Sequence, residues 1–514
     1  MTRLLTPLMA ALVLAGCATA PTPPQAQIDV PAAFKEAAAL QGSWKAAEPA
    51  ESQPRGEWWL AFNDPALTDL QQQAAVANPS LAAAAARVKA ARALLTASRS
   101  GLFPQVNLNA GVTRQKTSPA LQGLAADASV PPATVWQAGI GASYEIDLFG
   151  RVANGIDAAQ SDLQATEAGY RSVLLALQAD VAQAYYLLRT LDAEVAVLAG
   201  TQDLRQQTLQ LIERRRAAGD VSELDVSRAR TDLATTRAEL QGLQGQRQRA
   251  EHALAVLLGR APAAYSFEAR PLPADVQVPQ VPAGLPSALL ERRPDVAAAQ
   301  ARMMAATSRV GQARSALFPA LVLTGQRGQA SYELSDLFHW DARTWLASAV
   351  MSLPLFDGGR NRAAITSAEA SLEASVADYR QSVLNAFGDV EGQLSSLGAV
   401  RAQSESLAEA VVAARRAAEL ADKRYRAGED SYLTLIDTQR SLLAIERQAV
   451  QLRGAWASST VGLIRALGGG WGAPADRTAA SAPQAGSDAP ANKLALLTTP
   501  TQPSSPSSPE SPSR

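Results

Sequence analysis

The chain is 514 residues long and nearly neutral, with 47 Lys and Arg against 48 Asp and Glu and a formal net charge of −1 at pH 7. Because neither sign of charge dominates, the composition gives no indication of a nucleic-acid partner. Alanine is abundant and only 5% of residues are aromatic, which favours long helices packed through small side chains. Beyond residue 16, no run of roughly 18 to 20 apolar residues predicts a helical membrane span.

The N-terminus has the pattern of a bacterial export signal. Arg3 precedes an apolar run, an order typical of secretory signal peptides. The Leu-Ala-Gly-Cys segment that ends at Cys17 resembles the lipobox, whose cysteine becomes the acylated first residue of the mature protein, and Ala18 after it favours the outer membrane. Cys17 is the only cysteine and has no disulfide partner within the chain. We expect residues 1–16 to be a lipoprotein signal and Cys17 to carry diacylglycerol and palmitate; the alternative is an ordinary cleaved signal with an incidental cysteine.

Residues 17–56 are rich in Pro, Ala and Gln, and we expect them to form a lipidated N-terminal tether. A first repeat is predicted over residues 57–260. Its helical pattern begins near Asp64, is interrupted at Asn78-Pro79, and continues to about Ser100. Pro65, directly after Asp64, and Pro79 each mark the boundary of a helix, because a helix interior excludes proline.

Beyond Pro104 the pattern changes to strict alternation of apolar with polar or small residues. It runs first as Val-Asn-Leu-Asn-Ala and begins again at Trp136. A period of two predicts β-strands, so we expect strands at about 105–114 and 136–146, joined by a long loop.

Two long helices are predicted next. Apolar residues then step by three and four: Leu174, Leu177, Val181, Ala184, Leu188, Leu191, Val195 and Leu198. This spacing is typical of a coiled-coil seam. One helix over 156–218 would be roughly 95 Å long at ~1.5 Å per residue. We expect the chain to turn near Gly219 and to return as a second helix that ends at Leu258-Gly259.

The same plan recurs after a proline-rich linker at residues 261–286. Phe318 lies 215 positions after Phe103, and Gly428 lies 209 positions after Gly219. A repeat of this length indicates a duplicated architecture. The second repeat is predicted over residues 287–471, with strands at about 320–330 and 345–355 and a hairpin tip near Gly428, followed by a disordered tail over 472–514.

The tip at Gly428 joins two helices that contain no proline. A glycine tolerates the left-handed conformation that ends a helix, and Asp430 or Ser431 can cap the next one.

Four strands of about ten residues have the length of membrane-spanning β-strands. Lipid does not tolerate unpaired sheet edges, and known barrels need at least eight strands. One chain therefore cannot close a barrel, and we expect several chains to share one, with their hairpins forming a helical tube. The alternative is a soluble coiled-coil lipoprotein with an ordinary small sheet.

The chain resembles the outer membrane factors of tripartite efflux pumps, the TolC and OprM family, and especially their NodT-type lipoprotein branch. The matching motifs are Trp58-Trp59 through Phe62-Asn63-Asp64-Pro65, Leu102-Phe103-Pro104, Asp147-Leu148-Phe149-Gly150-Arg151, Glu291-Arg292-Arg293-Pro294-Asp295-Val296, Leu355-Phe356-Asp357-Gly358-Gly359-Arg360 and the tip from Tyr425 to Asp437.

This resemblance implies a mixed α and β membrane protein of the outer membrane. The family is a homotrimer with a 12-stranded β-barrel, four strands per protomer, that continues as a long α-helical coiled-coil tunnel in the periplasm. It implies contact with outer membrane lipid and two protein partners: a periplasmic adaptor and an inner-membrane RND-type pump that supplies the energy.

The resemblance also assigns a gate near the tips. Asp437 matches a ring aspartate and Leu433 matches the constricting leucine of the periplasmic mouth. Three identical carboxylates on an axis would favour cations, whereas the plainer alternative makes Asp437 an ordinary solvated helix residue. Gly219 and Gly428 match the turns that contact the adaptor.

A latch between hairpins is implied as well. Tyr425 matches the latch tyrosine, and Asp225 matches the carboxylate it meets. The sequence departs from the TolC pattern at Asp430, where that pattern has a basic residue, so Arg424 or Arg426 is a candidate substitute.

No catalytic pattern is present. The two histidines, His252 and His339, have no metal-type spacing, and no phosphate-binding loop or nucleophile elbow occurs. We expect a protein that is not an enzyme and has no cofactor beyond the covalent lipid. Its first predicted function is a passive, gated duct that exports drugs or other small molecules. The alternatives are the exit duct of a type I protein secretion system and a non-channel structural coiled-coil lipoprotein.

Overall fold

The computed structural model gives the fold of one chain. The described residues are 20–24, 30–31, 33–37, 56–125, 127–276, 278–279, 281 and 292–469. All of them belong to one compact unit, Met1–Ala473. Cys17 and the predicted tail over 472–514 lie outside the described residues, so the lipid anchor and the tail stay predictions.

The folded part opens with the 3-10 turn η2 (Trp58–Phe62) and two helices, α2 (Pro65–Ala77) and α3 (Pro79–Arg99). Each helix begins at a proline and is capped by the side chain before it. The carboxylate of Asp64 and the amide oxygen of Asn78 each accept hydrogen bonds from two backbone N–H groups of the following helix. These caps satisfy donors that a first turn leaves free, so the break at Asn78 separates two helices.

The first hairpin consists of α4 (Arg151–Ala217) and α5 (Glu223–Leu257). With 67 residues, α4 is roughly 100 Å long at ~1.5 Å per residue. It begins at residue 151 rather than at the predicted 156, because Gly150 at φ 74° turns the chain directly into the helix. Among the described helices, none combines the length and the apolar character needed to cross a membrane.

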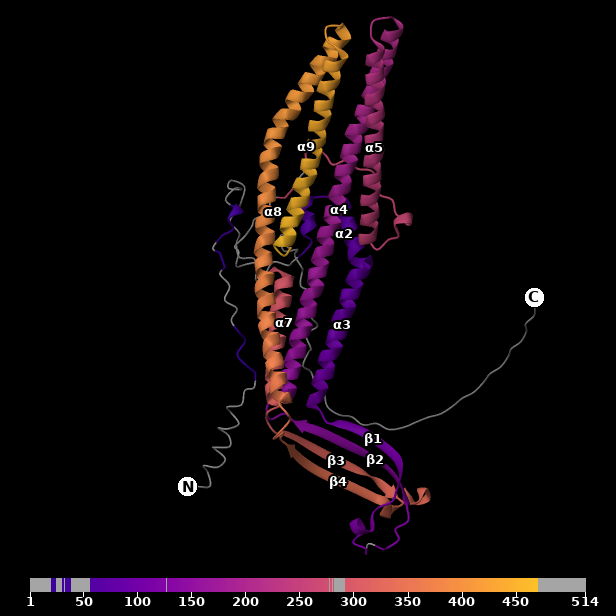
Figure 1. Ribbon diagram of the computed structural model, residues 1–514, viewed down its shortest axis with the longest axis vertical. Helices are drawn as coiled ribbons and strands as arrows, with labels where there is room; N and C mark the ends of the chain where they lie inside the picture. The colour runs from indigo at the N-terminus through magenta and orange to yellow at the C-terminus, as the bar shows by residue number, and fades with distance from the viewer. Residues whose placement is uncertain are drawn as a thin grey trace, which may run out of the picture. The chain divides into compact units, whose positions relative to one another are not determined.

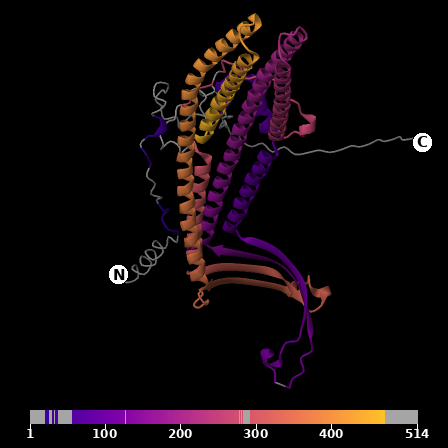
Figure 2. The ribbon, with the colours of Figure 1, turned by 45° about the horizontal axis from the view of Figure 1, so that its top comes forward.

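The second repeat supplies α7 (Pro294–Ser315), α8 (Arg360–Ala427) and α9 (Tyr432–Ala466). α8 has 68 residues, and α9 has 35, as many as α5. The duplicated sequence therefore builds two hairpins of matching length. Figures 1 and 2 show both hairpin tips at one end of this unit and the sheet at the other.

The strands β1 (Gln105–Gln115), β2 (Ala133–Ile146), β3 (Ala320–Ser331) and β4 (Arg343–Ser352) form one antiparallel sheet in the order β1-β2-β3-β4. The two repeats thus meet where β2 pairs with β3. The predicted extension of the fourth strand to 355 is wrong. Pro354 follows shortly after the end of β4, and proline has no N–H group to give to a neighbouring strand.

Residues directly opposite each other in this register lie on the same face of the sheet. Leu108, Ile140, Arg327 and Trp345 form one such row. We call the face that carries this row the apolar face, and it holds Val106, Leu108, Ala110, Val112, Arg114, Thr134, Trp136, Ala138, Ile140, Ala142, Tyr144, Ile146, Leu321, Leu323, Gly325, Arg327, Gln329, Ser331, Arg343, Trp345, Ala347, Ala349 and Met351. The polar face includes Gln105, Asn107, Asn109, Gln137, Ser143, Glu145, Thr324, Gln326, Thr344 and Ser348.

α4 is the central helix of the bundle and packs against α3, α5, α7 and α9. Its predicted seam is part of the core, since Leu177, Val181, Leu188 and Leu198 are all buried. Each leucine buried in this way contributes about 1.5–3 kcal/mol. A second, smaller apolar cluster lies near the tips and contains residues from both hairpins: Leu209, Ile212, Val226, Ala229, Leu233, Ala421, Tyr425, Tyr432, Leu435 and Ile436.

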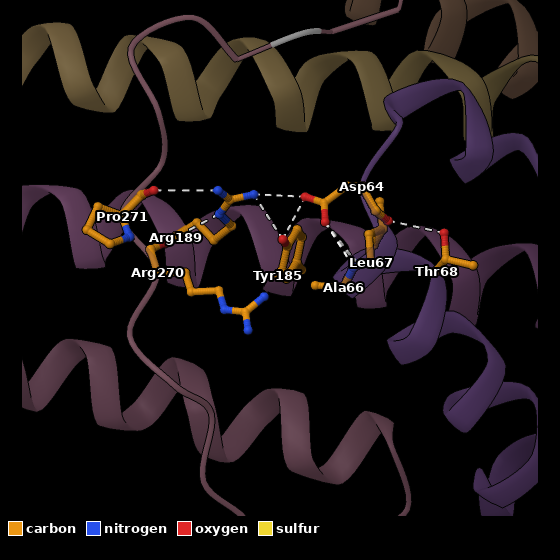
Figure 3. A network of polar contacts seen from close by, with 8 residues as sticks. All are labelled: Asp64, Ala66, Leu67, Thr68, Tyr185, Arg189, Arg270 and Pro271. Carbon is orange, nitrogen blue, oxygen red and sulfur yellow. Dashed lines mark hydrogen bonds and ion pairs between the residues drawn. The ribbon is translucent and has the colours of Figure 1, made fainter.

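A polar network ties the N-terminal helices, α4 and the inter-repeat linker together (Figure 3). The carboxylate of Asp64 accepts hydrogen bonds from the Tyr185 hydroxyl at 2.7 Å and from Arg189 at 2.8 Å. Arg189 also donates to the backbone carbonyls of Arg270 at 3.3 Å and Pro271 at 3.5 Å. Burial, aided by the bond to Asp64, raises the pKa of Tyr185. The linker between the repeats is therefore held against the first hairpin.

Candidate functional site at the hairpin tips

Both tips turn on a glycine in the left-handed region. Gly219 has φ 84° and Gly428 has φ 80°. One residue further on, the backbone N–H of Asp220 and that of Glu429 each donate at 2.9 Å to a carbonyl five residues back. This arrangement closes the last turn of a helix and requires a residue without a Cβ penalty at the glycine position. The two tips of the repeat therefore use the same turn.

The helices that leave the tips are capped by serine. The Ser222 hydroxyl accepts a hydrogen bond from the Asp225 N–H, and the Asp225 carboxylate accepts one in return from the Ser222 N–H, which completes a capping box. At the second tip, Ser431 accepts from the Thr434 N–H at 3.3 Å. Of the two caps predicted for α9, Ser431 is the one used.

The two predicted gate residues lie on one exposed face of α9. Leu433 and Asp437 are four residues apart and so project from the same side of the helix. Leu433 is 47% exposed, and the Asp437 side chain is 61% exposed. The nearest cation to Asp437 is Arg440, at 4.0 Å. Within one chain both side chains face solvent.

Tyr425, the predicted latch tyrosine, is buried at the tip. The guanidinium of Arg215 stacks over its ring at 5.0 Å and donates to the backbone carbonyls of Tyr425 and Arg426, at 3.2 and 3.0 Å. This contact joins the two tips of one chain. Burial raises the pKa of Tyr425, so its hydroxyl stays protonated, and this hydroxyl has no hydrogen-bond partner among the described residues.

The other latch candidates bind groups in their own hairpins. Asp225 caps α5, as described above. Arg424 pairs with Asp430 at 3.0 Å, and Arg426 pairs with Asp422 at 2.9 Å. The structure therefore forms no hydrogen bond between Tyr425 and Asp225 within the described part of a single chain.

A buried ionic cluster that the sequence analysis missed joins the two hairpins. Asp232 of α5, whose side chain is only 5% exposed, accepts hydrogen bonds from the Tyr432 hydroxyl at 3.3 Å and from the Arg440 guanidinium. Both donors lie on α9. The bond to Asp232 raises the pKa of Arg440, and burial raises that of Tyr432. One carboxylate thus holds the start of α9 to the first hairpin.

Arg205 of α4 binds the backbone of Asp232 rather than its carboxylate. It is buried, and it donates to the Asp232 backbone carbonyl at 3.0 Å and to the Thr236 hydroxyl. Burial lowers the pKa of Arg205, while the nearby charge of Asp232 acts in the opposite direction. Asp232 therefore compensates a buried cation on its own hairpin as well as Arg440 on the other.

A second cross-hairpin link lies further from the tips. The buried carboxylate of Glu194 on α4 accepts from Gln451 at 3.0 Å and from Arg447 at 3.4 Å, both on α9. Arg447 also pairs with Glu239 of α5 at 3.5 Å.

The repeat offered a signal for the Asp232 cluster. Asp232 lies 13 positions after Gly219, and Arg440 lies 12 positions after Gly428. Residues at equal distance from the two tips stand at equal height when the hairpins lie side by side. A search for opposite charges at matching distances from the glycines would have found this pair.

Comparison with known proteins covers both repeats. Residues 70–260 and 285–469 match the family model described as outer membrane efflux protein. The chain is 33% identical over 464 residues to the pyoverdine export outer membrane protein OpmQ of Pseudomonas aeruginosa, covering 90% of this chain and 96% of OpmQ. It is 34% identical over 471 residues to the outer membrane protein OprJ of the same species, covering 90% and 95%. The crystal structure of the open state of the Neisseria gonorrhoeae MtrE outer membrane channel matches with a TM-score of 0.77 at 29% identity, covering 88% and 98%.

The cluster predicts unequal effects for its two sides. Asp232→Ala should loosen the hairpins by about 3–5 kcal/mol, because it removes the partner of Arg440 and Tyr432 and the nearest acidic charge that offsets the burial of Arg205. Arg440→Ala should cost less, about 1.5–3 kcal/mol, because Arg440 is half exposed and its loss leaves Asp232 beside Arg205. The rate of tryptic cleavage at the arginine-rich tips of the purified protein measures this loosening.

Asp203→Ala is the matched control, since Asp203 is an exposed aspartate on the same hairpin. Its cleavage rate should equal that of the wild type. If Asp232→Ala and Asp203→Ala are cleaved at the same rate, the cluster does not hold the hairpins together.

Proposed function

The chain belongs to the outer membrane efflux protein family and is an outer membrane efflux channel, and we propose that it serves as the passive, gated exit duct of a tripartite system driven by an inner-membrane RND-type pump. The observation that carries this proposal is the match of both repeats, residues 70–260 and 285–469, to the family. The duct would export drugs or other small molecules, and it would do so without catalysis.

The proposed assembly is a homotrimer. β1 and β4 are the two edges of the sheet and each has one neighbour within the chain. Since open edges are costly in lipid and barrels need eight strands or more, pairing β1 of one copy with β4 of the next would close the sheet. Three copies would give 12 strands, and the hairpins below them would form the periplasmic tunnel.

The proposed adaptor contact lies at Gly219 and Gly428. A Cβ added at either glycine would meet no other atom within 4 Å, so both turns are open to a partner. The backbone hydrogen bonds from Asp220 and Glu429 close the two turns within the chain itself, so each turn would keep its shape when the adaptor binds.

The proposed gate consists of Leu433 and Asp437 from each copy. Their exposure within one chain leaves them available to meet their counterparts near the axis of a trimer. Three leucines would narrow the mouth, and three carboxylates would attract cations and repel one another. The Asp232 cluster would hold each α9 in place from within its own chain. The Tyr425 hydroxyl is buried within one chain, so the proposed latch would require the tip to open before this hydroxyl could meet a partner.

The function predicts a change in drug susceptibility. Deleting the gene from its host should lower the inhibitory concentration of at least one class of exported compound by about fourfold or more, and expression of the wild-type chain should restore it. The susceptibility of strains that express Asp232→Ala or the wild-type chain should be compared only when the two proteins are present at equal levels in the outer membrane. Unchanged susceptibility to every compound, together with loss of a protein from the medium, would favour type I protein secretion instead.

The gate predicts altered conductance in planar bilayers. Leu433→Ala should raise the open probability or the conductance of the closed channel about tenfold, equivalent to ~1.4 kcal/mol. Asp437→Asn should reduce the preference for cations over anions. Leu224→Ala is the matched control, because Leu224 lies 209 positions before Leu433 at the other tip and is 57% exposed. A tightly closed channel that neither gate substitution changes would show that the assignment is wrong.

The proposed lipid anchor predicts a mass difference. The mature wild-type protein should begin at Cys17 and carry diacylglycerol and palmitate, whereas Cys17→Ser should carry neither. Labelled palmitate and intact-mass measurement test this directly. Equal palmitate incorporation in the two proteins would place the lipid elsewhere or exclude it.

A further inference from the structure

The charged residues of the sheet are distributed unevenly between its faces. Among the residues of β1 to β4, the charged ones are Arg114, Glu145, Arg327 and Arg343. The three arginines all lie on the apolar face. Glu145 lies on the polar face and pairs at 2.7 Å with Arg151 at the start of α4. The apolar face therefore carries positive charge and no acidic side chain from the strands.

These arginines also lie at one end of the strands. Arg114 and Arg343 are next to the loops that join β1 to β2 and β3 to β4, and Arg327 lies in the loop-side half of β3. The half of the apolar face next to the helices has only apolar side chains at the corresponding positions, including Tyr144 and Ile146. The positive charge is thus confined to the part of this face furthest from the periplasmic helices.

Arg327 and Arg343 are close neighbours. Arg327 lies opposite Trp345, and Arg343 lies opposite Gln329 one step along the same face, so the two arginines are diagonal neighbours whose Cα atoms are roughly 7–8 Å apart. Both are exposed. No ion pair or hydrogen bond joins either guanidinium to another residue in the described part of the chain, although Arg343 lies over the ring of Trp340.

A shallow hollow surrounds this pair. Its volume is about 960 Å³. Small residues such as Ala138 and Gly325 line it, and Arg327, Arg343 and Trp340 stand beside them. Trp340 and Trp345 are 77% and 81% exposed. Exposed tryptophans are typical of the level at which lipid headgroups meet acyl chains.

The hollow would stay open in the assembled protein. It lies mainly over the inner strands β2 and β3 and extends to Arg343 on the edge strand β4. Neighbouring copies would join through the backbone edges of β1 and β4, so a second copy would lie beside the hollow and would not cover this face of the sheet. The cost of an arginine on a lipid-facing strand falls toward the membrane interface, which is the level that the exposed tryptophans indicate. Anionic lipid headgroups at that level can supply the partner that both guanidinium groups lack in the described part of the chain.

We propose that Arg327 and Arg343, together with Trp340, bind the phosphate group of a phosphorylated lipid in the outer leaflet of the outer membrane. This inference rests on the proposed barrel, in which the apolar face contacts lipid. The two guanidinium groups can each donate two hydrogen bonds to phosphate oxygens, and the tryptophans would pack against the sugar or the upper acyl chains. Each protomer would hold one such lipid.

Native mass spectrometry of the full-length trimer tests the site. The probes are lipid A with both phosphates and the same lipid A after enzymatic dephosphorylation. The wild type should retain one phosphorylated lipid A per protomer and bind the dephosphorylated form at least about tenfold more weakly, equivalent to ~1.4 kcal/mol. Arg327→Gln combined with Arg343→Gln should bring the binding of phosphorylated lipid A down to that level.

Arg362→Gln is the matched control. It removes the same charge from an exposed position in the first turn of α8, at the helix side of the sheet, and it should leave lipid A binding unchanged. Arg327→Lys, which keeps the charge but loses the planar fork, should bind with intermediate strength.

The outcomes separate this proposal from the proposed function. Equal binding of phosphorylated and dephosphorylated lipid A by the wild type would overturn the site, whatever the variants do. The same spectra report the mass of the trimer. A trimer that conducts in planar bilayers but shows no phosphate preference would overturn the lipid site alone, whereas absence of a trimer would overturn the proposed assembly on which the site rests.

Discussion

The free hydrogen-bonding groups on the outer edges of β1 and β4 are the constraint from which the rest of the arrangement follows. Four strands paired in sequence order leave two open edges in every chain, and lipid offers no partner for the N–H and C=O groups on them. The proposed ring of three chains satisfies these groups. It also sets the positions of the helices, because α4 and α8 begin only a few residues after β2 and β4 end. A closed ring of strands therefore becomes a ring of helices.

The duplicated sequence gives each chain two hairpins of matching length, which the proposed ring of helices requires. Since α4 and α8 have 67 and 68 residues and α5 and α9 have 35 each, both hairpins of a chain reach the same height. Contacts that need short distances can then form between residues at equal depth, and the Asp232 cluster depends on this equality. A change of a few residues in one hairpin alone would move Arg440 by several ångströms along the axis at ~1.5 Å per residue.

The sequence predicted what local pattern controls and missed what packing between distant segments controls. Strands, hairpins and repeats follow from periodicity and from the spacing of glycine and proline, which act on the backbone nearby. The start of α4 at Arg151 depends on the conformation of Gly150. The periodic apolar pattern begins further along the chain, so it does not reveal this start. Asp232 looked like one polar residue on a long helix, because nothing local shows which neighbouring helix it will face.

The predicted latch illustrates the same limit at the tips. The family pattern placed Tyr425 and Asp225 together, and it could not show that Asp225 completes a capping box with Ser222. A carboxylate near the start of a helix also interacts favourably with the helix dipole, so capping competes with any latch for the same oxygens. A latch through Asp225 must therefore share or disrupt the cap, which links gating to the stability of the first turn of α5.

Two aspartates near the tips have opposite environments. Asp232 contacts the other hairpin, whereas Asp437 belongs to the proposed gate. Asp437 is largely exposed, as its proposed role at the mouth of the duct requires, whereas Asp232 is buried among its partners. Inside the protein the interaction of Asp232 with Arg440 is less weakened by water. In the described part of the chain, the hydrogen bonds that Arg205 donates go to groups of α5, so it would stay with Asp232 if α9 moved away. The carboxylate would then keep one cationic neighbour when Arg440 and Tyr432 leave, which makes separation of the hairpins less costly than exposing a lone buried charge.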